Sequence, residues 1–233
     1  MSPNGGAGSA HPSVLVFDVN ETLLDIDTLA PDFERIFGDP AAVRTWFSQL
    51  VLYSMTLTLS GHYIDFFQLG EAVLGMLGDI KGVPISRHQK RALREAMLTM
   101  PAHPDVEPGL QRLSDSGFRL VTLTNSPHIA DAPTAVHFAR IHEYFERQFT
   151  VDATAAFKPA PALYHRVAAE LDVAESDCMM VAAHTWDTIG AQSAGMRGAL
   201  ITRPGNAPLV AEGVPQPTLT ARDLNDLAAQ LTG

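Results

Sequence analysis

Short apolar runs alternate along the chain with stretches in which apolar residues recur at helical spacing. Val14-Leu15-Val16-Phe17 is an unbroken apolar run that ends at Asp18, a pattern typical of a strand buried on both faces. The same pattern predicts strands over 119–124, 149–151, 179–183 and 198–202. Helical patterns predict helices from Pro108 to Gly117, from Pro127 onward, over 161–171, over 186–194, and after the capping segment 220–223. This alternation predicts an α/β fold with a Rossmann-like parallel sheet and right-handed crossovers.

One long stretch departs from the alternation. Residues 26–100 contain no convincing strand and several patterns of 3.6-residue period. Helices are expected over 40–53, over 64–77, and from the N-cap Ser86 to about residue 97. We therefore expect three parts: a loose tail over 1–12 that is rich in Gly, Ser, Ala and Pro, a core domain formed by 13–25 and 101–233, and an inserted helical cap domain over 26–100.

The bulk composition narrows the class of protein. The 233 residues include 46% apolar and 18% charged side chains, and the formal net charge is −10. This charge disfavours nucleic acid and anionic membrane surfaces as partners. Cys178 is the single cysteine, so no internal disulfide is expected. The start of the chain lacks the basic and apolar regions of a signal peptide, and no apolar run approaches 18 residues. We expect a cytoplasmic enzyme, with a homodimer as a further hypothesis.

Chemically useful side chains follow the predicted strands at the points where they end. Asp18 follows the first, Thr124-Asn125-Ser126 the second, Lys158 comes after the third, and His184-Thr185-Trp186-Asp187 the fourth. In an open parallel sheet, ligands bind outside the carboxyl ends of the strands, so these groups are expected on one rim. Each of them alone is weak evidence, since an Asp after a strand is usually a turn former. Their coincidence on one rim predicts an active site.

These segments resemble the four motifs of the haloacid-dehalogenase superfamily. Asp18-Val19-Asn20-Glu21-Thr22 resembles the first motif, Leu123-Thr124-Asn125-Ser126 the second, Phe157-Lys158-Pro159 the third, and Trp186-Asp187 the fourth. Order and spacing fit from about residue 13 to 231, and the similarity is closest to the 2-haloacid dehalogenase (type II) branch. The resemblance implies hydrolytic dehalogenation of a small 2-haloalkanoic acid to the 2-hydroxy acid.

The departures from the superfamily's phosphatases favour the same reading. Those enzymes carry a second Asp, two residues after the first, that protonates the leaving alkoxide. Here that position is Asn20, which has no titratable proton, and a departing halide needs none. The phosphatases also hold Mg²⁺ with acidic residues of the fourth motif, whereas here Ala183 stands four residues before Asp187. We therefore expect no metal and no other cofactor.

The resemblance also implies a role for each catalytic residue. Asp18 attacks the carbon that bears the halogen and forms an ester, and Lys158 keeps its carboxylate ionised. Thr22 and Thr124 are candidate hydroxyl donors to Asp18, and backbone N–H groups from Val19 onward are expected to hold the oxyanion. Asp187 is expected to position the water that hydrolyses the ester.

The substrate pocket is expected to include Asn125, Ser126, Tyr164, Trp186, Phe47 and His184. Tyr164 matches a family position that contacts the substrate carboxylate, although packing on the core face of its helix fits the sequence equally well. Phe47 stands where the family usually has an Arg that contacts halide, and His184 is the best candidate to replace the lost donor. Arg44 is expected to face elsewhere, since it lies two residues before Trp46. A compact site rich in donors suggests the hypothesis that fluoroacetate is accepted beside chloroacetate.

Two other functions stay open on the sequence. A phosphatase of the same superfamily, acting on a small phosphate ester, predicts Mg²⁺ dependence. The other alternative is a binding protein on this scaffold that has lost catalysis. Asn20, Ala182 and the missing Arg would then be signs of a lost active site. This alternative gives no reason for the chain to keep Asp18, Lys158 and Asp187 together. The scaffold alone does not decide among these functions.

Overall fold

A six-stranded sheet forms the centre of the core domain. The computed structural model describes residues 11–233, and residues 1–10 of the expected tail lie outside the described residues. All neighbouring strands pair in parallel, in the order β3-β2-β1-β4-β5-β6. The strands are β1 (Val14–Phe17), β2 (Arg119–Thr124), β3 (Arg147–Thr150), β4 (Cys178–Ala182), β5 (Arg197–Ile201) and β6 (Leu219–Ala221). The central position of β1 explains its unbroken apolar run, because both of its faces are buried.

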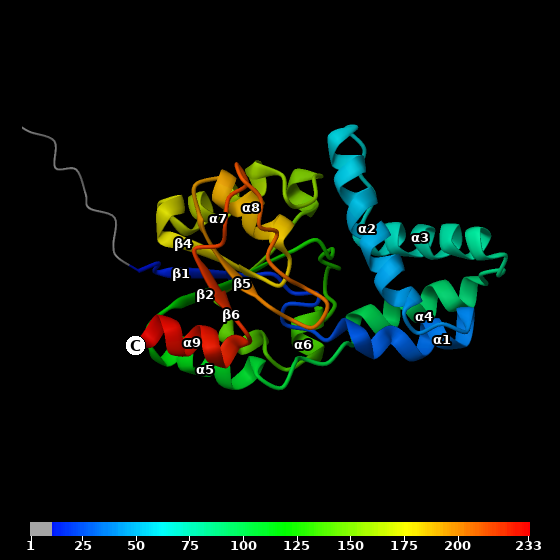
Figure 1. Ribbon diagram of the computed structural model, residues 1–233, viewed down its shortest axis with the longest axis horizontal. Coiled ribbons are helices and arrows are strands. Elements are labelled where there is room, and N and C mark those ends of the chain that lie inside the picture. The colour runs from blue at the N-terminus through cyan, green and yellow to red at the C-terminus, as the bar shows by residue number, and fades with distance from the viewer. Residues whose placement is uncertain (1–10) are drawn as a thin grey trace, which may run out of the picture.

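Helices cover both faces of the sheet (Figure 1). α7 and α8 lie on one side of it, and α5 and α9 pack against each other on the other. The helices of the core are α5 (Val106–Asp115), α6 (Ala135–Phe138), α7 (Pro161–Leu171), α8 (Thr185–Ser193) and α9 (Leu224–Thr232). The predicted parallel α/β fold is confirmed.

The long stretch between β1 and α5 is helical. It contains α1 (Ala30–Phe37), α2 (Ala42–Leu59), α3 (Phe66–Lys81) and α4 (Arg87–Leu98), which form a separate group beside the sheet (Figure 1). Ser86 begins α4 as expected, in a capping box with Gln89. Trp46 of α2 is fully buried and donates its ring N–H to the carbonyl of Gly70 in α3 at 2.9 Å, so these helices pack on one another, and their buried residues are continuous with the core around the sheet.

Three expectations about local structure were wrong. The helix expected from Pro127 onward is a loop as far as Thr134, because two prolines, Pro127 and Pro133, interrupt it within eight residues. α5 begins two residues before Pro108, so that this proline lies in its first turn. The short strand β6 was not expected.

Among residues 11–233, no helix combines the length and the hydropathy that crossing a membrane requires.

Candidate active site

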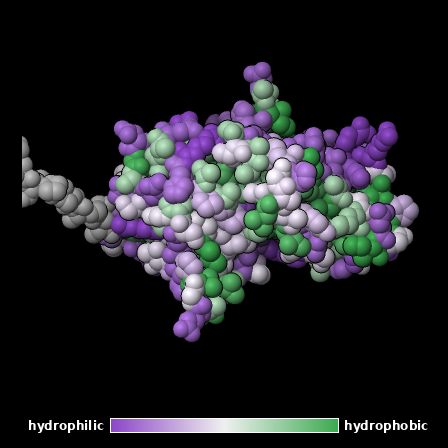
Figure 2. All heavy atoms as spheres, turned by 90° about the horizontal axis from the view of Figure 1, so that it is seen from above, coloured by the Kyte–Doolittle hydropathy of each residue, from purple (hydrophilic) through white to green (hydrophobic). Residues whose placement is uncertain are grey.

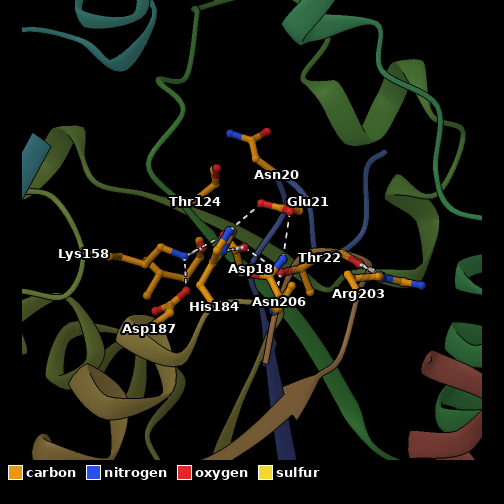
Figure 3. Close-up of polar contacts among 12 residues, drawn as sticks. Asp18, Asn20, Glu21, Thr22, Thr124, Lys158, His184, Asp187, Arg203 and Asn206 are labelled. Atoms are coloured by element: carbon orange, nitrogen blue, oxygen red, sulfur yellow. Dashed lines mark hydrogen bonds and ion pairs between the residues drawn. The ribbon is translucent and has the colours of Figure 1, made fainter. Parts of the chain in front are cut away.

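The strand ends bring Asp18, Lys158 and Asp187 together into a buried ion cluster, here called the inner cluster (Figure 3). The Lys158 ammonium lies 2.8 Å from Asp18 Oδ1 and 2.6 Å from Asp187 Oδ2, and it also donates to the carbonyl of Leu123 at 2.9 Å. All three side chains are almost completely buried. One cation thus bridges two carboxylates, and all three of its protons have acceptors.

The inner cluster sets the charge of the expected nucleophile. Burial alone would raise the pKa of Asp18, but the ion pair with Lys158 and the nearby His184 lower it well below its usual range. Burial likewise tends to lower the pKa of Lys158, but the two carboxylates outweigh this effect and raise it. Asp18 is therefore an anion and Lys158 a cation at neutral pH.

Thr22 and the chain around it orient the second oxygen of Asp18. The Thr22 hydroxyl donates to Asp18 Oδ2 at 2.6 Å and accepts from the backbone N–H of Ala183 at 2.9 Å. Arg203, which follows β5, donates to the Thr22 carbonyl from two of its nitrogens. The first-motif loop is thereby attached to the segments that follow β4 and β5.

Thr124 and Tyr164 lie in contacts other than those expected. The Thr124 hydroxyl accepts from the backbone N–H of Ser126 at 3.1 Å and makes no hydrogen bond to Asp18 among residues 11–233, so its role as a donor to Asp18 stays a prediction. The Tyr164 hydroxyl donates to Asp187 Oδ1 at 2.6 Å, in a fully buried position, so its expected contact with the substrate carboxylate is corrected. Burial and the Asp187 carboxylate raise the pKa of Tyr164 well above its usual value, which keeps the hydroxyl proton in place.

Close packing around α8 explains why Tyr164 can reach Asp187. Gly190 faces Pro159 and Tyr164, and a Cβ atom at this position would lie only 2.4 Å from Pro159 Cβ. The missing side chain allows α8 to lie against the Lys158–Pro159 segment, whose peptide bond is cis. Each oxygen of Asp187 is consequently bound, one by Tyr164 and the other by Lys158.

A second polar group, here called the outer cluster, consists of Glu21, Arg44 and His184. His184 was expected in the site, whereas Glu21 and Arg44 were missed in the sequence. Glu21 is buried and has a left-handed backbone (φ 68°). Its carboxylate binds His184 Nε2 at 2.7 Å and the amide of Asn206 at 2.8 Å (Figure 3). It also forms an ion pair with Arg44 of α2. Arg44 also pairs with Asp27 at 2.8 Å, contrary to the expectation that it faces elsewhere.

His184 is the point at which the two clusters meet. Its Nδ1 atom lies 3.6 Å from Asp18 Oδ2, is buried, and has no hydrogen-bond partner among residues 11–233. Its ring stacks on Trp186 with 5.1 Å between centroids and packs on Phe47 at 5.7 Å. The imidazole is thus held by two rings and one carboxylate, with one nitrogen directed at the nucleophile.

The cavities place most of the expected pocket residues. A small inner chamber of about 10 Å³ is lined by Asp18, Asn20, Phe47, Val51, Phe66, Asn125, His184 and Trp186. A larger open pocket of about 610 Å³ shares Phe47, Val51, His184 and Trp186 with it. Val19 and Ser126 instead line a separate hollow against α6, and Ser126 accepts from Asn20 at 3.1 Å. Neither Tyr164 nor Asp187 lines the inner chamber.

The site fits a divalent metal poorly. The oxygens of Asp18 and Asp187 are bound by the Lys158 ammonium and by the hydroxyls of Thr22 and Tyr164. Mg²⁺ requires several oxygen ligands in an octahedron, and the ammonium lies between the two carboxylates that would supply them. Among residues 11–233, no group of three or more His, Cys, Asp or Glu side chains is placed to hold a metal ion.

Comparison with known proteins agrees with this geometry. (S)-2-haloacid dehalogenase 1 of Pseudomonas sp. (strain CBS-3) is 30% identical over 190 residues, covering 81% of this chain and 83% of that protein. A phosphoglycolate phosphatase of Colwellia psychrerythraea is 26% identical, covering 81% and 84%. A solved L-2-haloacid dehalogenase superposes with a TM-score of 0.87 at 26% identity, covering 96% and 100%. The family model of haloacid dehalogenase-like hydrolases matches residues 12–195, and the chain therefore belongs to this family.

Proposed function

We propose that this protein is a hydrolytic 2-haloacid dehalogenase whose nucleophile is Asp18. The observation that carries the proposal is the state of this carboxylate, which is anionic, faces a small buried chamber, and is held by Lys158 and Thr22. Attack on the halogen-bearing carbon inverts that carbon, releases halide and leaves an ester on Asp18. One oxygen of Asp18 forms the ester and the other stays free. The free oxygen keeps its hydrogen-bond donor, Lys158 or Thr22, and this donor stabilises the negative charge that develops on the oxygen when water attacks in the second step.

The residues of the inner chamber suit a small acid. Phe47, Trp186 and Phe66 provide apolar walls, which also exclude water from the ionised nucleophile. The side-chain oxygen of Asn125 accepts from the backbone N–H of Lys158 at 3.0 Å, so its NH₂ group is the part that remains to donate to halide or carboxylate. The chamber shares Phe47, Val51, His184 and Trp186 with the larger pocket, so a haloacetate would extend across both, and we propose that fluoroacetate is accepted beside chloroacetate. A fluoride electrode and a chloride assay on the two haloacetates test this point.

Isotope labelling tests the covalent route. A single turnover in H₂¹⁸O with excess enzyme is expected to place the label in the peptide that contains Asp18, because water attacks the carboxyl carbon of the ester. Label found only in the hydroxy acid would mean direct attack by water on the substrate. The Asp18→Asn variant serves as the matched control and is expected to release no halide above background.

The phosphatase alternative has support from the relative of that name. In this chain, Asn20 stands where the proton donor of a phosphatase is expected, and its amide donates to Ser126. EDTA distinguishes the two functions: halide release is expected to be indifferent to the chelator, whereas a phosphatase would lose its activity. Binding of haloacids without halide release would instead favour the non-catalytic alternative.

We also propose a cellular compartment and an oligomeric state for this protein. The single cysteine, Cys178, is a buried free thiol, which suits a reducing cytoplasm. Apolar side chains are exposed on and near α2, with Leu59 90% and Leu52 52% exposed, and Figure 2 shows hydrophobic surface over the helical end of the molecule. We propose a homodimer that covers part of this surface, and light scattering measures the molar mass that tests it.

A further inference from the structure

The second half of the reaction requires a base, and Asp187 is poorly placed for that task. The ester on Asp18 is hydrolysed by a water molecule that must lose a proton as it attacks. Asp187 does not line the inner chamber, and its two oxygens accept from Tyr164 and Lys158. The contacts of Asp187 indicate a different role, which is to hold the Lys158 ammonium in place beside Asp18. The proton of the attacking water needs another acceptor.

We propose that His184, held by Glu21, is the general base that activates water for hydrolysis of the Asp18 ester. This inference rests on the proposed function. His184 lines the chamber, and its Nδ1 atom is buried, without a hydrogen-bond partner among the described residues, and 3.6 Å from Asp18 Oδ2. The chamber has about the volume that one water molecule needs. A water that binds Nδ1 in this chamber lies beside the carboxyl carbon it must attack.

Glu21 acts on this base as a positioning residue. Its carboxylate faces Nε2 at 2.7 Å and can only accept, so Nε2 donates its proton to Glu21 and the lone pair of Nδ1 faces the chamber. The rings of Phe47 and Trp186 fix the plane of the imidazole. Arg44 and Asn206 bind the other Glu21 oxygen, so the carboxylate itself has one orientation.

The groups around His184 come from both clusters. In the free enzyme the imidazole faces the carboxylates of Glu21 and Asp18, while Arg44 and Lys158 lie on the far sides of these two groups and Asp187 lies behind Lys158. Ester formation removes the charge of Asp18, and Glu21 is then the one carboxylate that faces the imidazole. A water molecule bound between Nδ1 and the ester has Nδ1 as its nearest base.

The hydrolytic step balances with this assignment. The water oxygen bonds to the Asp18 carboxyl carbon while one water proton passes to Nδ1. The bond between that carbon and the ester oxygen then breaks, and the leaving alkoxide takes the proton back from the imidazolium. The new Asp18 carboxyl group then loses its proton to solvent, which restores the anionic nucleophile. One proton and one halide leave per turnover.

Pre-steady-state kinetics on His184 variants test the proposal. With excess enzyme and chloroacetate, His184→Gln is expected to release one equivalent of chloride and then to stall, with the ester on the Asp18 peptide detected by mass spectrometry. Hydrolysis of that ester is expected to slow by about 100-fold or more, the usual contribution of a general base. His184→Phe keeps a ring between Phe47 and Trp186 and is expected to stall in the same way. Thermal unfolding confirms that each variant is folded.

The positioning role of Glu21 has its own readout. Glu21→Gln is expected to slow ester hydrolysis less than the loss of His184, and to move the pH dependence of that step while leaving the chloride burst in place. The matched control is His165→Gln, which removes a surface histidine that pairs with Glu175 at 2.9 Å, and it is expected to behave like the parent enzyme.

Three outcomes overturn the inference. Folded His184 variants that turn over at the parent rate without accumulating ester would remove His184 from the hydrolytic step. Folded variants without a chloride burst would place His184 in substrate binding or halide release. Ester accumulation in Asp187→Asn but not in His184→Gln would make Asp187 the base. Absence of halide release by the parent enzyme would instead overturn the proposed function itself.

Discussion

The inner and outer clusters meet within one site but are built in different ways. The inner cluster, Asp18, Lys158 and Asp187, comes from strand ends and the loops that follow them, and it is shut away from solvent. The outer cluster joins the first-motif loop to cap helix α2 through Arg44, which is 35% exposed. The inner cluster is fixed by the sheet, whereas the outer one depends on how the cap lies against the core. We therefore expect the first step, formation of the ester, to fail when the inner cluster is broken, and the second step, its hydrolysis, to slow when the outer cluster is broken.

The largest effect is expected from Lys158→Met, which leaves two buried carboxylates without their cation. Activity should fall by about 10³-fold, the upper range for losing one preorganised donor. Stability should fall by about 3–5 kcal/mol, because breaking a buried ion pair leaves charge unpaired. Chloride release and urea unfolding measure the two effects. Lys81→Met, which removes a surface lysine 3.8 Å from Asp39, is the matched control.

The pH profile of the same variant separates charge from packing. An acid whose pKa is lowered by folding stabilises the protein above its unfolded pKa and loses that contribution as the pH falls through the folded value. With Lys158 present, Asp18 therefore stays ionised throughout the mildly acidic range. Without Lys158, burial raises the pKa of Asp18, so residual activity should increase with pH. An unchanged profile would show that Lys158 does not control this ionisation.

A smaller effect is expected from Arg44→Met in the outer cluster. Glu21 keeps Asn206 and His184 as partners but loses its cation, so turnover should fall by about tenfold, or ~1.4 kcal/mol in activation free energy. Arg35→Met, which removes an exposed ion pair with Asp32 on α1, should leave turnover unchanged. Equal losses for Arg44→Met and Lys158→Met would erase the distinction between the two clusters.

An effect of similar size, on selectivity and not on turnover, is expected from Phe47→Ala. The Phe47 ring lines both the inner chamber and the outer pocket, so its removal makes room for a longer acid. The ratio of kcat/KM for 2-chloropropionate over chloroacetate should rise by about tenfold, the lower end of what one methyl-sized group changes in a pocket. Phe33→Ala removes a buried ring of the cap that lines neither cavity, and it should destabilise the protein without moving this ratio.

The sequence predicted the inner cluster because strand periodicity fixes where each buried run ends. Asp18 and Asp187 follow central strands, and a parallel sheet brings such ends to one edge. Tyr164 was placed in the site for its spacing from Lys158, but the direction of its hydroxyl depends on the close approach at Gly190. That contact joins two elements whose packing no local pattern reveals.

Two members of the outer cluster, Glu21 and Arg44, were missed for physical reasons. Glu21 adopts a left-handed backbone that is uncommon for a non-glycine residue, and this turns its carboxylate toward His184. Arg44 was counted from Trp46, two residues away, although it lies three residues before Phe47 and thus on the same helical face. That spacing was a usable signal. Asn206, in contrast, lies in an irregular loop and offers none.

The left-handed backbone at Glu21 has a consequence for laboratory evolution of this protein. Glycine adopts that conformation without the strain a side chain imposes, but Glu21→Gly also removes a buried carboxylate that binds Arg44, Asn206 and His184. Relief of the backbone strain and loss of these contacts therefore act on stability in opposite directions, whereas turnover only loses. Libraries that vary this loop need a screen for turnover beside one for heat resistance.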